Sequence, residues 1–237
     1  MKKSAYKRAL CALFSAFLVL TMVFPGEVAL AASAPGNVAR FSMTGCSAST
    51  VSLSWNKVKG ASGYRIRRYD SKSKKWKTVL TATKGSAIKG TVKKLSPATT
   101  YKLQIHAYKK AGKKTLYSKK AKTLTVATKP AKVTLQSVKA NGAKITVSWK
   151  KSADSGYQVI YARNKQFKNG ESILVGGSNK TTTYYAPYSG TYYVHLRPYK
   201  NLNGKKYYGS WSNTKAVKVN IPKQAYHTET VWAKRGK

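Results

Sequence analysis

Residues 51–55 read Val-Ser-Leu-Ser-Trp, and residues 145–149 read Ile-Thr-Val-Ser-Trp. Apolar and polar side chains alternate in both stretches, so every second residue faces the same side of an extended chain. This period of two is typical of a half-buried antiparallel strand and not of a helix, whose apolar residues recur every three or four positions. The two stretches therefore predict an all-β protein whose strands turn one face towards a core.

The same order of motifs follows each of these stretches. Gly63-Tyr64 follows the first and Gly156-Tyr157 follows the second, and the two pairs are 93 residues apart. Alternating segments then run over residues 101–108 and 192–199, which are 91 residues apart. A repeat at nearly constant spacing indicates a duplicated unit, and about 90 residues suit one β-sandwich.

The first 31 residues have the form of a secretory signal peptide. Four cations precede an apolar run at residues 9–23, which is shorter than the roughly 20 residues that a membrane span needs. Ala29-Leu30-Ala31 places small residues just before an expected cleavage at Ala32. We therefore predict a secreted protein with no transmembrane segment, and an uncleaved anchor is the alternative. The net charge of the chain adds the expectation that the exported protein is cell wall-associated.

The chain after residue 31 contains a single cysteine and ends in a segment without a predicted strand. Cleavage would leave Cys46 as the single cysteine, so the fold has to be stable without an internal disulfide. We expect Cys46 to be a small buried residue and not a reactive thiol, although a role in dimerisation stays open. Residues 221–237 lie beyond the last predicted strand, and we expect a flexible basic tail or the start of a further module.

The charge balance disfavours most enzyme classes. The chain has 46 Lys and Arg against 5 Asp and Glu, a formal net charge of +41, and only three histidines. Paired carboxylates, metal-ligand sets and nucleophile–base pairs have almost no raw material in such a sequence. We predict a protein that is not an enzyme and has no catalytic residue, no metal site and no cofactor. His106 and His195 fall on polar strand positions, where we expect them to face solvent.

The two units resemble fibronectin type III domains over residues 34–128 and 130–220. The resemblance rests on an early proline in each unit (Pro35 and Pro130), the strand tryptophans and the Gly-Tyr pairs. It implies two tandem seven-stranded antiparallel β-sandwiches after the signal peptide, of a kind found in exported proteins of Gram-positive bacteria. It also implies an aromatic set in the structural core of the two units: Trp55, Tyr64, Tyr101, Trp149, Tyr157 and Tyr192.

One motif of the resemblance differs between the units. Leu95-x-Pro97-x-Thr99-x-Tyr101 looks like the family's tyrosine corner, in which the tyrosine hydroxyl bonds to the backbone just upstream. Tyr192 stands at the corresponding place of the second unit. The preceding residues there do not fit the pattern, because Ala186, Tyr188 and Gly190 replace Leu, Pro and Thr. The resemblance therefore leaves the corner of the second unit open.

Three lysine-rich segments stand out in the first unit. On the fibronectin type III pattern they fall near the C–C′ turn, on the F–G hairpin and at the start of strand G, so they could form one cationic face. Such a face would bind anionic cell-wall polymers or other extracellular polyanions. Lysine, a point charge, outnumbers arginine 35 to 7 after residue 31, so we expect diffuse attachment and no sequence-specific nucleic-acid recognition. The candidates are Lys72, Lys74, Lys75, Lys77, Lys109, Lys110, Lys113, Lys114, Lys119 and Lys120.

Several other interpretations of the function stay open. One alternative is a well-solvated basic surface without any particular ligand. Aromatic side chains could stack on sugar rings, and the candidates for such a glycan platform are Tyr184, Tyr188, Tyr207 and Trp211. The chain could also be an accessory fragment of a larger cell-wall enzyme, or an adhesin with a protein partner, although it contains no Arg-Gly-Asp sequence.

Overall fold

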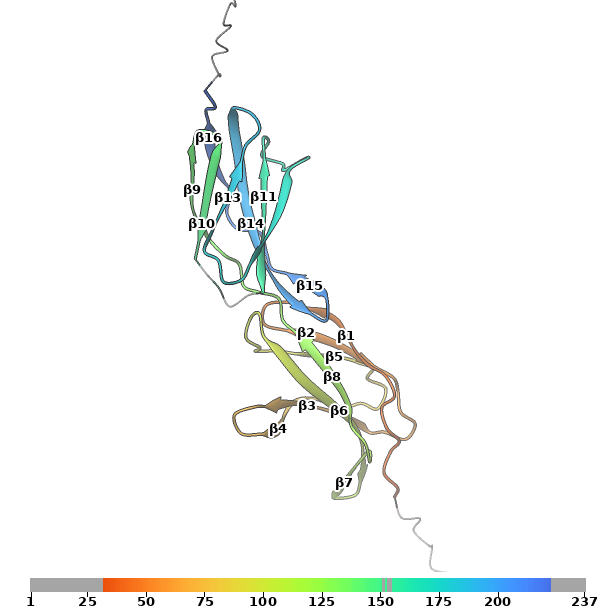
Figure 1. The fold of residues 1–237 in the computed structure, drawn as a ribbon. Coiled ribbons are helices and arrows are strands. Elements are labelled where there is room, and N and C mark those ends of the chain that lie inside the picture. The colour runs from red at the N-terminus through yellow and green to blue at the C-terminus, as the bar shows by residue number, and fades with distance from the viewer. Residues whose placement is uncertain (1–31, 151, 153–154, 223–237) are drawn as a thin grey trace, which may run out of the picture. The chain divides into compact units, whose positions relative to one another are not determined.

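The computed structural model describes residues 32–150, 152 and 155–222 (Figure 1). Every regular element in that part of the chain is a β-strand. The described residues contain no helix that could span a membrane. The predicted signal peptide at residues 1–31 and nearly all of the predicted basic tail lie outside the described residues.

The first sandwich has one sheet of three strands and one of five strands. The smaller sheet has the order β1-β2-β5, and the larger has the order β4-β3-β6-β7 with β8 also paired to β6. Every pairing in both sheets is antiparallel. The strands are β1 (Phe41–Cys46), β2 (Val51–Trp55), β3 (Gly63–Asp70), β4 (Lys75–Ala82), β5 (Lys89–Val92), β6 (Thr100–Ala111), β7 (Lys114–Tyr117) and β8 (Lys122–Ala127).

The second sandwich repeats this topology strand for strand. Its smaller sheet has the order β13-β10-β9, and its larger sheet has the order β12-β11-β14-β15 with β16 also paired to β14. The strands are β9 (Leu135–Asn141), β10 (Lys144–Trp149), β11 (Gly156–Ala162), β12 (Glu171–Gly176), β13 (Thr181–Tyr185), β14 (Gly190–Leu202), β15 (Lys205–Tyr208) and β16 (Lys215–Val219).

The last strand of each sandwich is interrupted once. β7 pairs with the end of β6 and β8 pairs with its beginning, so the two segments occupy one strand position. The Ser118 N–H still donates to the Ala107 carbonyl at 2.9 Å in the interval between them. β15 and β16 share β14 in the same way. Each sandwich therefore has seven strand positions, and the predicted fold class is confirmed.

A tryptophan and a tyrosine lie at the centre of each core. Trp55 packs on Tyr64 with ring centroids 5.5 Å apart, and Trp149 packs on Tyr157 at 5.0 Å. All four are buried, as is Tyr192, whereas Tyr101 is half-buried at the edge of its core. Alternation explains the pattern, because the first, third and fifth residues of β2 are buried and the two serines between them are not.

Close packing explains why a glycine precedes the core tyrosine in each unit. A Cβ atom on Gly63 would lie 2.5 Å from the hydroxyl of Tyr108 and would also meet the Ala82 carbonyl oxygen. A Cβ atom on Gly156 would lie 2.5 Å from the hydroxyl of Tyr199. The late tyrosine of each repeat thus covers the early glycine, and the two motifs form one packing contact.

Both units have a tyrosine corner, but the hydrogen bond runs in opposite directions. The Ser96 N–H donates to the Tyr101 hydroxyl at 2.8 Å. In the second unit the Tyr192 hydroxyl donates to the Tyr188 carbonyl at 3.1 Å. A hydroxyl group can donate or accept a hydrogen bond. The second unit therefore has a tyrosine corner although it lacks the Leu-Pro-Thr pattern, which answers the question that the sequence left open.

Candidate binding surfaces

The structure places the first two lysine clusters at opposite ends of one sheet. β3 and β6 are antiparallel, with Gly63 opposite Tyr108 and Arg68 opposite Leu103. The β3–β4 turn therefore lies at the beginning of β6, and the β6–β7 hairpin lies beyond its end. At about 3.3 Å per residue along a strand, the two are roughly 30 Å apart. The strands that carry the clusters do belong to one sheet, but the first two clusters lie at its opposite ends, because successive hairpins of an antiparallel sheet turn at opposite ends.

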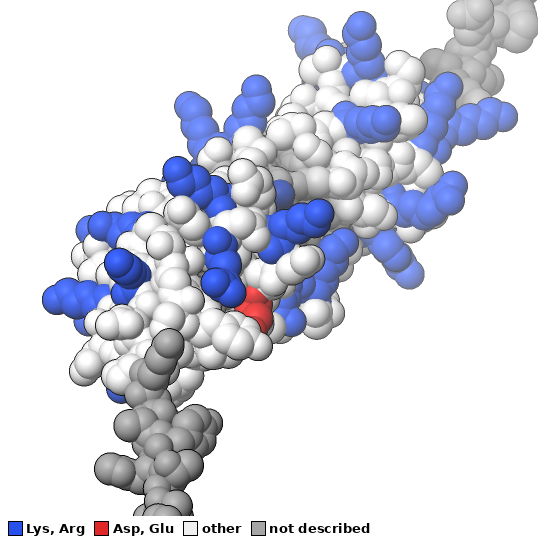
Figure 2. All heavy atoms as spheres, turned by 90° about the horizontal axis from the view of Figure 1, so that it is seen from above, with Lys and Arg blue, Asp and Glu red and all other residues white. Residues whose placement is uncertain are grey.

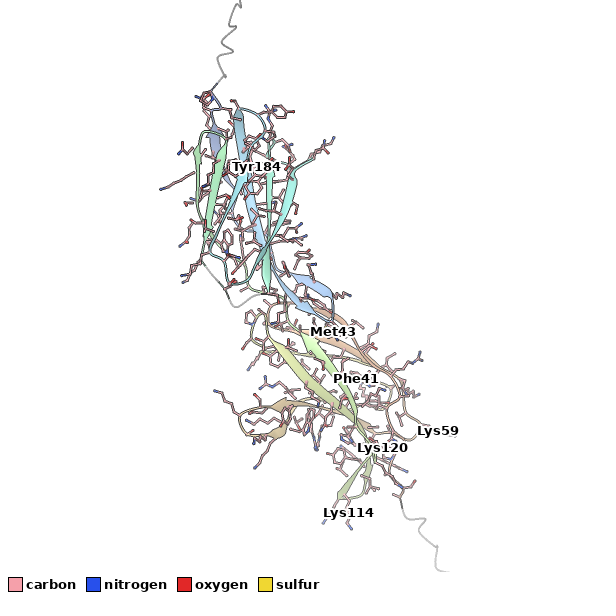
Figure 3. The ribbon with its side chains drawn as sticks, viewed as in Figure 1. Phe41, Met43, Lys59, Lys114, Lys120 and Tyr184 are labelled. Atoms are coloured by element: carbon pink, nitrogen blue, oxygen red, sulfur yellow. The ribbon has the colours of Figure 1, made fainter. Side chains whose placement is uncertain are left out.

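The individual lysines are well exposed. The turn cluster consists of Lys72, Lys74, Lys75 and Lys77, all of them exposed, and the hairpin cluster consists of Lys109, Lys110, Lys113 and Lys114, of which only Lys109 is half-buried. Lys119 and Lys120 lie exposed between β7 and β8. Figure 3 shows Lys114 at the hairpin tip, directed away from the β3–β4 hairpin. Figure 2 shows Lys and Arg side chains standing out over the whole visible face.

One carboxylate sits inside the turn cluster. Asp70 forms an ion pair with Lys77, and its Oδ1 accepts the backbone N–H groups of Lys72 at 3.0 Å and Ser73 at 3.3 Å. The hydrogen bond from Lys77, followed by that from Ser73, lowers the pKa of Asp70 to about 2. This is the one ion pair within the described residues, where the carboxylates are Asp70 and Glu171. Nearly every described lysine and arginine therefore has no acidic partner there.

Arginines of β3 lie on tyrosine rings of the first sandwich. The guanidinium carbons of Arg65 and Arg67 lie 4.8 and 5.7 Å from the ring centroid of Tyr117, and that of Arg68 lies 5.4 Å from the ring centroid of Tyr101. Cation–π contacts of this kind hold a guanidinium without neutralising it. Sequence reasoning passed over these arginines because it looked for runs of lysine, although Arg-Ile-Arg-Arg at residues 65–68 was a visible signal.

The outer face of the second sandwich carries a stack of planar groups. His195 lies between Phe167 at 3.5 Å and Trp211 at 3.9 Å, with interplanar angles of 6° and 10°. The guanidinium carbon of Arg197 follows at 4.3 Å from the Trp211 ring and 4.0 Å from the Tyr208 ring. The Arg197 Nε donates to the Gln158 amide oxygen at 2.8 Å. We call these five residues (Phe167, His195, Trp211, Arg197 and Tyr208) the outer stack.

The outer stack corrects the expectation that His195 faces open solvent. The ring does point to the outer face, but its neighbours enclose it, and Nε2 is buried with no hydrogen-bond partner among the described residues. Burial, and then the charge of Arg197, lowers the pKa of His195 from 6.5 to about 4. His106 is half-buried, with Nδ1 3.1 Å from the Ser118 carbonyl oxygen. Neither imidazole is the free side chain that the alternation predicted.

The four aromatic residues proposed as a glycan platform are not brought together. Tyr184 packs against the core and stacks on Tyr161 with centroids 4.5 Å apart, and burial raises its pKa to about 12. Figure 3 shows Tyr184 among the strands of its sandwich. Tyr188 is 64% exposed and lies by Arg163, Tyr207 contacts Lys205, and Trp211 belongs to the outer stack. The four side chains do not form one platform, because Tyr184 comes from β13 of the smaller sheet and packs on the core, whereas Tyr207 comes from β15 of the larger sheet.

The described residues contain no group of three or more His, Cys, Asp and Glu side chains that could hold a metal ion. Cys46 is a free, half-buried thiol at the end of β1. Burial raises its pKa above the ordinary value of 9.0. A raised pKa disfavours the reactive thiolate, which agrees with a packing role.

Comparison with known proteins points to one family for the first sandwich. Residues 33–123 match the fibronectin type III domain. No curated protein matches the chain. Among solved structures, the chain is similar to a segment of two fibronectin type III domains from chicken tenascin, with 18% identity and a TM-score of 0.43 over 80% of this chain and 100% of that one. It is also similar to the FN1–FN3 domains of chicken CNTN1, with 19% identity and a TM-score of 0.41 over 78% and 68% of the two chains.

Fibronectin type III domains act as binding modules or as spacers, and this role suits the first sandwich. The second sandwich has the same strand order and the same Trp–Tyr core pair. We therefore use the term fibronectin type III-like for the fold of both.

Proposed function

We propose that this chain is a secreted binding or spacer protein at the cell surface, retained there by anionic cell-wall polymers. It would consist of two fibronectin type III-like modules at residues 34–128 and 130–220, following a cleaved signal peptide, and would do no chemistry itself. The observation that carries the proposal is the unpaired charge, since one ion pair accompanies the many exposed lysines of the described residues.

The arrangement of the lysines favours a long polymer over a compact ligand. Clusters roughly 30 Å apart on one sheet exceed the reach of a small anion, but a flexible polyanion can contact both. Each contact releases counterions and is individually weak, so that the affinity comes from their number. Lysine suits this role, because its ammonium group is a point charge that imposes little geometry on its partner.

Co-sedimentation of residues 32–237 with purified cell walls tests the proposal. We expect binding that falls steeply between about 50 and 500 mM salt, because a Debye length of about 10 Å at 0.1 M shrinks to about 3 Å at 1 M. We also expect binding to be lost when the anionic polymers are stripped from the walls. Binding that ignores both salt and stripping would contradict the proposal and would favour recognition of neutral glycan.

A matched pair of variants separates charge from shape. Replacing Lys109, Lys110, Lys113 and Lys114 with Gln removes four charges from the hairpin cluster, and replacing the same four residues with Arg keeps them. The Gln variant should need less salt for release, and the Arg variant should behave like the parent chain. Equal weakening in both variants would indicate that the hairpin's shape matters and its charge does not.

A further inference from the structure

The larger sheet of the first sandwich opens at one end. The pairing between β3 and β6 stops at Arg68 and Leu103. β3 nevertheless continues to Asp70, paired with β4, and β6 already begins at Thr100, paired with β8. The β3–β4 hairpin therefore leaves the sheet as a two-stranded ribbon, and Figure 1 shows it turning away from β6.

An open groove of about 730 Å³ lies between the separated strand ends. Three cationic residues line it, Arg68 and Lys72 from the β3 side and Lys102 from the β6 side. Thr100 and Thr125, whose hydroxyls can donate hydrogen bonds, also line the groove, whereas the Thr99 hydroxyl already donates to the Pro97 carbonyl at 2.7 Å. The groove thus combines positive charge with donors from both of its walls.

The groove contains one acidic residue, and that residue is already engaged. Asp70 pairs with Lys77 and accepts two backbone N–H groups of the turn, as described above. Arg68, Lys72 and Lys102 have no carboxylate partner among the described residues. An anion that enters the groove would therefore meet uncompensated positive charge and would not have to displace an existing ion pair.

Arg68 is held in place before any ligand arrives. Its guanidinium group lies on the ring of Tyr101, and the Ser96 N–H fixes the hydroxyl of that tyrosine. A guanidinium group presents a planar fork of N–H donors that matches two oxygens of one phosphate. Because its position is already fixed, less side-chain entropy is lost on binding than for a free surface lysine.

We propose that this groove is the site where the first sandwich seats a phosphate group of a linear polyanion. Arg68 holds two phosphate oxygens, and Lys72 and Lys102 approach from the two walls. The inference rests on the proposed function and narrows it, since it assigns the phosphate class of polymer and one fixed point of contact along that polymer. The exposed lysines outside the groove contribute only diffuse attraction.

The test measures binding of linear inorganic polyphosphate to residues 32–237 by isothermal titration calorimetry at fixed ionic strength. The pair K72Q and K102Q, combined in one chain, removes two exposed charges at the groove, and the control pair K113Q and K114Q removes two exposed charges at the far hairpin. We expect the groove pair to weaken binding by at least about tenfold, since each hydrogen bond to a charged group contributes roughly this factor, and the control pair by less than about threefold.

Two further measurements test the role of Arg68 and the position of the bound phosphate. R68Q should weaken polyphosphate binding at least as much as the groove pair, provided that its melting temperature shows a folded chain. Short tripolyphosphate should shift the backbone amide resonances of residues 99–102 in NMR spectra and leave those of the β6–β7 hairpin unchanged. This second result does not depend on any variant.

The outcomes distinguish this inference from the proposed function. Equal losses in the groove pair and the control pair would overturn the groove and would leave diffuse polyanion retention intact. Equal binding of poly-glutamate, with the same dependence on Arg68, would overturn the assignment to phosphate. Failure of the parent chain to bind polyphosphate would also overturn the inference, while co-sedimentation with cell walls would still decide the proposed function separately.

Discussion

The outer stack makes the stability of the second sandwich depend on pH through His195. Its pKa is lowered from 6.5 to about 4, so the folded state holds the ring neutral in a range where the unfolded chain would protonate it. A group of this kind contributes stability that is complete above the unfolded pKa. That stability is lost as the pH falls from 6.5 to about 4, because protons then bind preferentially to the unfolded chain.

The size of the effect follows from the difference in pKa. One pH unit corresponds to about 1.4 kcal/mol, so the full difference corresponds to at most about 3 kcal/mol. The ring keeps some contact with water, which screens its interactions, and we therefore expect about 2 kcal/mol. A loss of this size is a large fraction of the roughly 5–15 kcal/mol by which a domain is stable.

H195F provides the comparison, because phenylalanine keeps a planar ring between Phe167 and Trp211 but cannot be protonated. Urea unfolding of the parent chain and of H195F is measured at pH 7, 6, 5 and 4 by circular dichroism and tryptophan fluorescence. The difference in unfolding free energy between the two chains should move by about 2 kcal/mol in favour of H195F between pH 7 and pH 4. Parallel pH profiles would refute the reasoning, and so would an NMR titration that placed the His195 pKa near 6.5.

The remaining predictions concern single packing and hydrogen-bonding contacts of the first sandwich. G63A should lower the unfolding free energy by about 1–3 kcal/mol, measured by urea denaturation, because its methyl group collides with Tyr108. Y101F should cost about 0.5–1.5 kcal/mol, because the exposed Ser96 N–H exchanges its hydroxyl acceptor for water, and its melting temperature should fall. T128V should cost a similar amount, since the buried Thr128 hydroxyl donates to the Ser96 carbonyl at 2.7 Å; an unchanged melting temperature in either variant would contradict the corresponding contact.

The ion pair between Lys77 and Asp70 is expected to matter less for stability than the contacts of the first sandwich described above. K77Q removes the ion-pair partner of Asp70 at an exposed position, where solvent screens the pair, so we expect the urea midpoint of unfolding to stay nearly unchanged. The same variant should raise the pKa of Asp70 from about 2 towards its ordinary range, which an NMR titration of the carboxyl carbon would show. An Asp70 pKa that stays near 2 would assign its shift to the backbone N–H groups of Lys72 and Ser73 alone.

Local features of the sequence were sufficient to predict the fold class. Alternation at Val51, Leu53 and Trp55 indicated which side chains enter the core, because strand geometry places every second residue on one face. The repeat of the Gly-Tyr pairs indicated two units of one kind. The contact between Gly63 and Tyr108 explains why that motif recurs, although the sequence did not show that the two residues meet.

The candidate surfaces depended on relationships that the sequence does not contain locally. His195, Arg197, Trp211 and Phe167 come from β14 and from two loops, and only the folded chain shows that they stack. Alternation correctly turned His195 to the outer face, but it could not show that neighbouring rings enclose it. The burial of a side chain depends on which residues from other segments pack against it, and only the tertiary structure shows this.

The lysine clusters illustrate the same division. Their number, and hence the net positive charge of the chain, follows from the sequence alone, because charge depends on composition. Their separation depends on antiparallel pairing, which sends consecutive hairpins to opposite ends of a sheet. The groove at Arg68 depends on the point where β3 leaves β6, since a strand stays in a sheet only while its backbone groups remain paired with a neighbour.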